Sequence, residues 1–188
     1  MYAAALAFAL VSLPAVAQTK SSSLTSKAKA AFADITKAKS ALNAGNDKQG
    51  DGWLAKAETL LKSVMAKKGG SALAKTNTAS DAAQNGDAPK TTSALSQAEG
   101  AAAKLDPSLA QKLGVAKQES AQGDTNGASS TLAQAKSALA QKTGLSGIQD
   151  TYEKVTMARS LLKGGDSTKA KGILDQIPTS PTDLLKGL

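Results

Sequence analysis

The acidic residues of one short segment have the spacing of a calcium-binding loop. In the segment 47–58, DKQGDGWLAKAE, Asp47, Asp51 and Glu58 fall at positions 1, 5 and 12 of such a loop, and Gly52 falls at position 6. Carboxylate oxygens at these positions can surround one Ca²⁺, and the glycine permits the sharp turn. An acid is missing at position 3, the loop is single, and nearby lysines reduce the negative charge. We therefore interpret the segment as a turn between helices and expect no bound metal, with calcium binding as the alternative.

Groups for other kinds of catalysis are scarce, because the chain has no His and no Cys. A Ser-His-Asp triad, a Cys nucleophile and a metal site built on thiolate or imidazole are therefore excluded. Asp87, Asp124 and Asp166 each follow a Gly, where a carboxylate can cap the start of a helix. Ser160 lies three residues before Lys163, but nothing in the sequence adds a device to stabilise an oxyanion. We expect a non-enzymatic protein without catalytic residues or cofactors.

Lysine dominates the charge of the chain, which has 23 Lys and Arg residues against 15 Asp and Glu and a net charge of +8. Such a balance suggests nucleic acid or an anionic membrane as a partner. However, Arg159 is the only arginine, and aromatic residues make up 3% of the chain, so platforms for stacking bases are few. We interpret the lysines as a solvated face and expect no nucleic acid partner and no stable membrane insertion.

Residues 1–17, MYAAALAFALVSLPAVA, are apolar and uncharged and end in Ala15-Val16-Ala17. An apolar core followed by an A-x-A site is typical of a secretory signal peptide. The segment is too short for a comfortable transmembrane helix, and Pro14 interrupts it. We expect cleavage after Ala17 and a periplasmic location. Because no Lys or Arg precedes the apolar run, a buried N-terminal helix or an uncleaved anchor is the alternative.

A pattern near forty residues long occurs four times. A Gly followed by Asp or Asn recurs at spacings of 41, 37 and 42 residues, as Gly45, Gly86, Gly123 and Gly165. The Gly can end one helix in a left-handed conformation, and the next residue can cap the following helix. A period of this length predicts stacked helical hairpins.

Apolar residues recur at fixed distances from these four glycines, which predicts the core of each hairpin. Nine residues after each Gly stand Leu54, Leu95, Leu132 and Leu174, and twelve residues after stand Ala57, Ala98, Ala135 and Ile177. Seven residues before stand Ala38, Ala79, Ala116 and Ala158, and ten before stand Ile35, Thr76, Leu113 and Val155.

The fold class that these patterns predict is all-α, with antiparallel helical hairpins forming a bundle or a short solenoid. After the signal peptide 1–17 we expect a single helical domain over 18–188, with about four hairpin units. The alternative for the polar stretch 69–104, which is rich in Ala, Ser, Thr, Asn and Gly, is a flexible segment. The expected helices are 24–44, 53–67, 71–85, 89–104, 107–122, 126–142, 147–163 and 167–176, and the expected linkers include 21–23, 67–70, 105–107 and 143–147.

Two blocks of the sequence resemble the YfdX family of exported bacterial proteins. The first block, 34–45, has the pattern D-I-x-x-A-x-x-A-L-x-x-G, and the second, 151–177, contains V-x-x-A-x-x-L-L-x-x-G. The matching residues are Asp34, Ile35, Ala38, Ala41, Leu42 and Gly45 in the first block, and Val155, Ala158, Leu161, Leu162 and Gly164 or Gly165 in the second. The resemblance implies a mostly helical periplasmic protein linked to acid or heat stress, often oligomeric, with no established enzymatic activity and no catalytic residues to transfer.

Together, composition and resemblance predict a non-enzymatic periplasmic protein, associated with acid or heat stress, that has a chaperone-like or protein-binding role. Its partners would be unfolded or partner proteins, and a homo-oligomer is possible. In this hypothesis, helix faces bearing Leu, Ile and Val cover exposed apolar segments of client proteins. Two alternatives remain open: a peptide-binding scaffold similar to tetratricopeptide repeats, and a Lys-rich binder of nucleic acid or an anionic envelope surface.

The export hypothesis predicts that the mature chain begins at Gln18, because Ala15 and Ala17 supply the small side chains that a signal peptidase requires. Intact-mass measurement of the protein in the periplasmic fraction tests this. A cytoplasmic species that retains Met1 would contradict the expected location.

Overall fold

The computed structural model describes residues 16–68, 70–178 and 180–182, and within them the regular structure is α-helical, without β-strands. The all-α prediction is therefore confirmed. The helices are α1 Val16–Asn43, α2 Asp47–Lys68, α3 Gly70–Gln84, α4 Ala88–Ala102, α5 Pro107–Ala121, α6 Thr125–Thr143, α7 Ser146–Lys163 and α8 Ser167–Asp175.

Two boundaries in the first half of the chain differ from the sequence predictions. The serines at 21–23, expected to form a linker, lie inside α1. Helix α2 begins at Asp47 rather than at residue 53. The polar stretch 69–104, for which a flexible segment was the alternative, contains helices α3 and α4. Of the expected signal peptide, residues 1–15 lie outside the described part of the chain.

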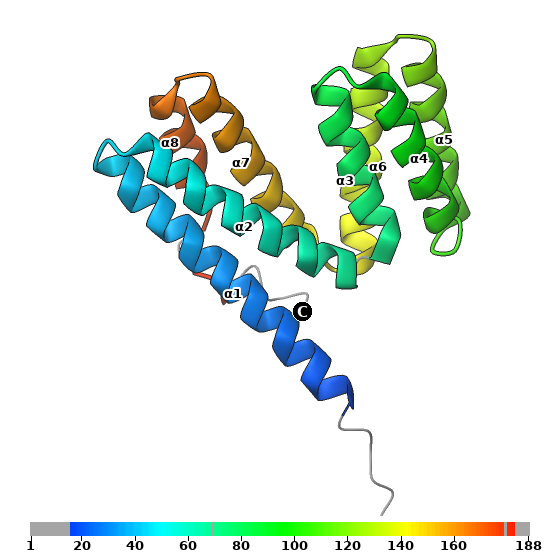
Figure 1. Cartoon of the computed structure of the whole chain (residues 1–188). Helices are drawn as coiled ribbons and strands as arrows, with labels where there is room; N and C mark the ends of the chain where they lie inside the picture. Colours follow the sequence, from blue (N-terminus) through cyan, green and yellow to red (C-terminus); the bar gives the residue numbers. More distant parts are fainter. Residues whose placement is uncertain (1–15, 69, 179, 183–188) are drawn as a thin grey trace, which may run out of the picture.

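The helices form two four-helix bundles side by side (Figure 1). The end bundle contains α1, α2, α7 and α8, which come from the two ends of the chain, and the middle bundle contains α3 to α6. In the end bundle, α2 packs on α7 and α1 on α8; in the middle bundle, α4 packs on α5 and α3 on α6. The chain crosses between the bundles twice, from α2 to α3 and from α6 to α7. Each bundle is thus a pair of antiparallel hairpins, and the predicted bundle arrangement is confirmed.

The turn within each hairpin has the same geometry in all four copies. Gly45, Gly86, Gly123 and Gly165 have φ angles of 74°, 70°, 79° and 80°, which lie in the left-handed region. The next residue donates its N–H to the carbonyl five residues back, at 2.9 Å, as Asp166 does to Leu161. This hydrogen-bonded helix end satisfies backbone carbonyl groups that the helix itself leaves without a partner.

The residue after each glycine also caps the following helix, as expected. Side-chain oxygens of Asp87, Asp124 and Asp166 accept backbone N–H groups three residues ahead, at 3.1, 2.8 and 3.0 Å. Asn46 accepts the N–H of Gln49 at 3.1 Å in the same way. Capping is therefore the observed role of these acidic residues.

The repeated apolar positions form the core of both bundles. The four leucines nine residues after each glycine are 0–1% exposed, and the four alanines seven residues before it are 0% exposed. Thr76, the only polar residue at these repeated positions, is also buried and donates its hydroxyl to the carbonyl of Ala72 at 2.8 Å. Alanine at so many core positions lets the helices approach closely.

Little apolar surface remains outside this core. In the described residues, the exposed large apolar side chains are Leu105, Val115 and Met157. No helix in the described ranges combines the length and the apolar character that crossing a membrane requires.

The hairpin of α7 and α8 gives a direct test of the core. Leu174 is fully buried, so Leu174→Ala should lower the free energy of unfolding by about 2–5 kcal/mol through lost transfer energy and a cavity. Lys169 lies on the outer face of the same helix, with 74% of its side chain exposed, so Lys169→Ala is a matched control that should leave stability near wild type. Chemical denaturation measures both. Equal stability of the two variants would show that this hairpin is not packed.

Candidate functional site

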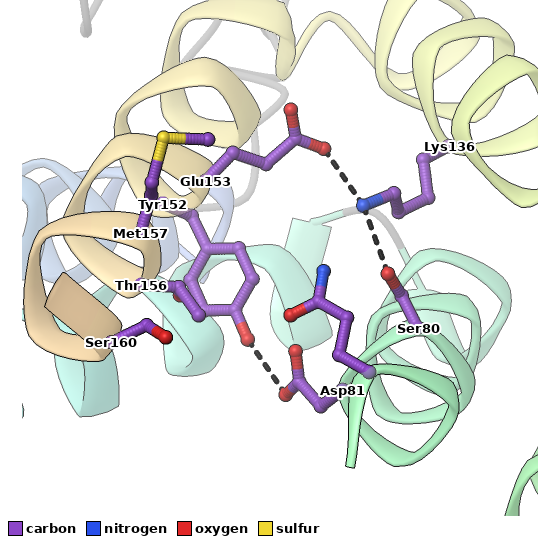
Figure 2. Close-up of a pocket in the computed structure, with 9 residues that line it drawn as sticks. Ser80, Asp81, Lys136, Tyr152, Glu153, Thr156, Met157 and Ser160 are labelled. Carbon is purple, nitrogen blue, oxygen red and sulfur yellow. Dashed lines mark hydrogen bonds and ion pairs between the residues drawn. The ribbon is translucent and has the colours of Figure 1, made fainter. Parts of the chain in front are cut away.

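A cleft separates α3 of the middle bundle from α7 of the end bundle. It consists of two adjacent cavities of about 360 Å³ and 260 Å³, which share Asp81, Gln84, Thr156 and Ser160 as lining residues. Figure 2 shows the larger cavity, with side chains of both bundles facing one another across it. We call this space the interbundle cleft. The larger cavity is also lined by Ser80, Lys136, Tyr152, Glu153 and Met157, and the smaller by Glu58, Asn85, Arg159 and Lys163.

A buried pair of amides closes the cleft near the junction of the bundles. Asn77 of α3 and Gln149 of α7 exchange two hydrogen bonds, of 3.0 and 3.1 Å. Both side chains are at most 4% exposed. Removing either partner would leave a buried polar group unpaired, which is costly. This pair therefore fixes the register between the two bundles.

A second link joins the bundles at the wall of the larger cavity. The hydroxyl of Tyr152 donates to Asp81 Oδ2 at 2.9 Å, and Lys62 Nζ lies 3.1 Å from the same oxygen (Figure 2 shows the tyrosine bond). Burial, together with the charge of Asp81, raises the pKa of the Tyr152 hydroxyl. The tyrosine therefore stays a hydrogen-bond donor.

The residues that suggested calcium binding lie on one continuous helix. Arg159 of α7 binds Asp51 at 2.8 Å and also Glu58, so these two carboxylates are occupied by a guanidinium. Residues 47–58 therefore form neither the turn between helices that we expected from the sequence nor the loop that calcium binding would require. The described ranges contain no group of three or more acidic side chains able to hold a metal.

Close packing between two helices explains why residue 50, in the same segment, is a glycine. Gly50 is buried in α2, and a Cβ at this position would collide with the side chain of Leu42. The glycine at this position therefore allows α1 and α2 to approach closely.

Lys136 and Ser80 form a hydrogen-bonded pair in the cleft that resembles a nucleophile with its base. Lys136 Nζ lies 3.2 Å from Ser80 Oγ and 3.0 Å from Glu153 Oε1 (Figure 2). A lysine base must be neutral to take a proton from serine. Here Lys136 is engaged in an ion pair with Glu153 and donates a hydrogen bond to Ser80. Ser80 also lies inside α3, where backbone N–H groups are occupied and cannot stabilise an oxyanion. The arrangement links the bundles and does not activate the serine.

Several polar groups in the cleft lack partners among the described residues. Thr156 Oγ1 is buried and makes no hydrogen bond. Gln84, Ser160 and Lys163 line the cleft, and their side chains make no hydrogen bond or ion pair with other described residues. The charged side chains in and around the cleft balance: the acids are Asp51, Glu58, Asp81 and Glu153, and the bases are Lys62, Lys136, Arg159 and Lys163. The cleft therefore offers hydrogen-bond donors and acceptors without a strong net charge.

The sequence singled out only part of this site. Ser160 and Lys163, noted for their spacing, do lie together at the cleft, although no hydrogen bond joins them. Asn77, Asp81 and Gln149 were missed, because the groups that meet here belong to different hairpins. A usable signal existed, since Asn77 and Gln149 are polar residues on the buried faces of their helices.

Comparisons with protein-family models, curated proteins and solved structures gave no match for this chain. The resemblance to the YfdX family therefore stays a prediction.

Glu58 forms a cluster with Lys62 and Arg159, and this cluster predicts how the stability of the fold depends on pH. Burial alone would raise the pKa of Glu58, but hydrogen bonds from Lys62 and Arg159 lower it below the ordinary value of 4.5. Folding therefore favours the charged form, which contributes stability above the unfolded pKa that is lost as pH falls through the folded pKa. Compared with Glu58→Gln, the wild type should be more stable near neutral pH, and the difference should shrink in acid.

Urea denaturation across this pH range measures the difference. Asp175→Asn, which removes an exposed carboxylate at the end of α8, is the control and should show a much smaller effect. A difference between wild type and Glu58→Gln that does not vary between neutral and acid pH would contradict the role assigned to the cluster.

Proposed function

We propose that this chain is a non-enzymatic, exported binding protein that holds a segment of a partner polypeptide in the interbundle cleft. The observation that carries the proposal is the cleft itself, where a buried and unpaired hydroxyl, Thr156 Oγ1, lies among further unpaired polar groups. Buried polar groups without partners are rare in folded proteins and invite an explanation. A bound ligand that supplies the missing hydrogen bond is such an explanation.

The chemistry of the cleft suits a polypeptide main chain. An extended segment presents alternating N–H donors and C=O acceptors. The amide of Gln84 on one wall and the hydroxyls of Thr156 and Ser160 on the other can each donate and accept. Because the charges of the cleft balance, a neutral main chain fits better than a strongly charged ligand.

This proposal replaces the way in which the sequence analysis expected clients to bind. That hypothesis required helix faces rich in Leu, Ile and Val to be open to clients. In the folded chain these faces are buried inside the bundles, as at Leu95 and Leu132. The chaperone-like role is therefore better supported as capture of polar main chain in the cleft. Export and a link to stress rest on the N-terminal segment and the family resemblance.

The contacts of the Lys136 side chain support a non-enzymatic role. Its side chain contacts both Glu153 and Ser80, so the lysine beside Ser80 is engaged in an ion pair and is not a free base. The cleft thus has the features of a binding site and lacks an activated nucleophile.

Blocking the cleft should abolish client protection. Ser160 lines both cavities and is exposed, so Ser160→Trp should fill the cleft without disturbing the core. Light scattering of a heat-stressed client enzyme should fall in the presence of the wild type, and most of this suppression should be lost with Ser160→Trp. Ser130→Trp, at an exposed position of α6, is the matched control and should protect like the wild type.

Two outcomes would contradict the proposal. If the wild type does not suppress scattering, the chaperone-like role fails. If Ser160→Trp protects as well as Ser130→Trp, clients bind elsewhere on the protein.

A further inference from the structure

One end of the molecule carries a group of lysines that the cleft does not use. They are Lys67 and Lys68 at the end of α2, Lys75 in α3, Lys104 after α4 and Lys112 in α5. We call this region the basic end.

The connectivity places these lysines together. In antiparallel bundles every second turn lies at the same end, so the α2–α3 corner, the α4–α5 turn and the α6–α7 connection share one end. Figure 1 shows the α2–α3 corner and the α4–α5 turn on the side of the molecule toward which the start of α1 also points. Lys75 and Lys112 each lie five residues from the start of their helix, about 7.5 Å along the axis.

The charge of the basic end is largely uncompensated. Asp106 and Asp150 are the carboxylates nearest these turns in the sequence, and they bind Lys142 and Lys154, each at 2.8 Å. Across the described residues, none of the five lysines of the basic end forms an ion pair, whereas eight other lysines do. The five lysines therefore leave positive charge without a paired carboxylate at this end.

An exposed apolar side chain stands among these charges. Leu105 lies between Lys104 and Asp106 in the α4–α5 turn and is 46% exposed. The turn is held in place, because Asp106 accepts the backbone N–H and the hydroxyl of Ser108 at 3.0 and 2.8 Å. Leu105 is thus presented at a fixed turn and not on a loose loop.

We propose that the basic end docks on the surface of a membrane that contains anionic phospholipids. Lysines near such a surface are attracted to the headgroups, and an apolar residue at the tip of a turn can enter the boundary with the acyl chains. Both features occur together at this end. The attachment is peripheral, which agrees with the finding that no described helix is suited to span a membrane.

A membrane fits these observations better than nucleic acid. Arg159, the only arginine, is bound to Asp51 and Glu58 away from the basic end. Aromatic side chains that could stack on bases are not available there either, since Tyr152 is buried and Trp53 lies near the α1–α2 turn at the opposite end. An exposed leucine adds nothing to binding a phosphate backbone, whereas it does add to binding a lipid surface.

Docking in this orientation would leave the interbundle cleft accessible. The cleft residues Gln84, Asn85 and Lys163 stand next to the Gly86 and Gly165 turns, which lie at the opposite end of the bundles. The protein would therefore face away from the membrane with its cleft open to the compartment.

Vesicle sedimentation of the protein purified from the exported fraction tests the proposal. Vesicles of phosphatidylcholine with phosphatidylglycerol should bind the wild type, and binding should weaken with salt, whereas pure phosphatidylcholine should bind far less. The triple variant Lys67→Gln, Lys68→Gln, Lys75→Gln should lower the partition coefficient by at least about tenfold. The matched triple variant Lys48→Gln, Lys90→Gln, Lys171→Gln removes the same charge from the opposite end and should bind nearly as the wild type does.

Two further measurements complete the test. Leu105→Ser should weaken binding to the anionic vesicles and should leave its salt dependence unchanged. Equal binding by the two triple variants, or no preference for anionic vesicles, would overturn the proposal. Binding of the wild type to a DNA duplex but not to anionic vesicles would overturn it as well.

Discussion

A left-handed glycine followed by a capping Asp or Asn is the constraint on which the rest of the structure depends. Each of the four turns reverses the chain within a few residues and satisfies groups at both helix ends. The reversal brings two apolar stripes face to face, which buries Leu and Ala at the same offsets in every hairpin. A hairpin alone cannot cover its second face, so hairpins must pair. Both bundles follow from that requirement.

The pairing of hairpins determines where the functional surfaces arise. The first and last hairpins pair with each other, so the two middle hairpins form a separate bundle between them. The contacts across the cleft are mainly polar, as in the Asn77–Gln149 and Tyr152–Asp81 bonds. These contacts hold the two bundles in one register, so the walls of the cleft keep a defined position relative to each other.

Much of the fold could be predicted from the sequence, because the signals are local. The glycine turns, the caps and the buried leucines each depend on residues within one hairpin. The pairing of hairpins could not be predicted, since the offsets of Leu54 and Leu174 are the same as those of Leu95 and Leu132. The start of α2 was misplaced because Gly50 acts through its contact with Leu42, which is a tertiary feature. The cleft escaped prediction for a similar reason, as its polar residues meet only after the bundles form.

The central claim is that a partner polypeptide lies between α3 and α7. Hydrogen exchange of the backbone amides, with and without an unfolded client protein, measures this most directly. The account predicts added protection in the second half of α3 and along α7, on the two walls of the cleft, and little change in α4 and α5. Protection confined to other helices, or no protection at saturating client, would contradict it.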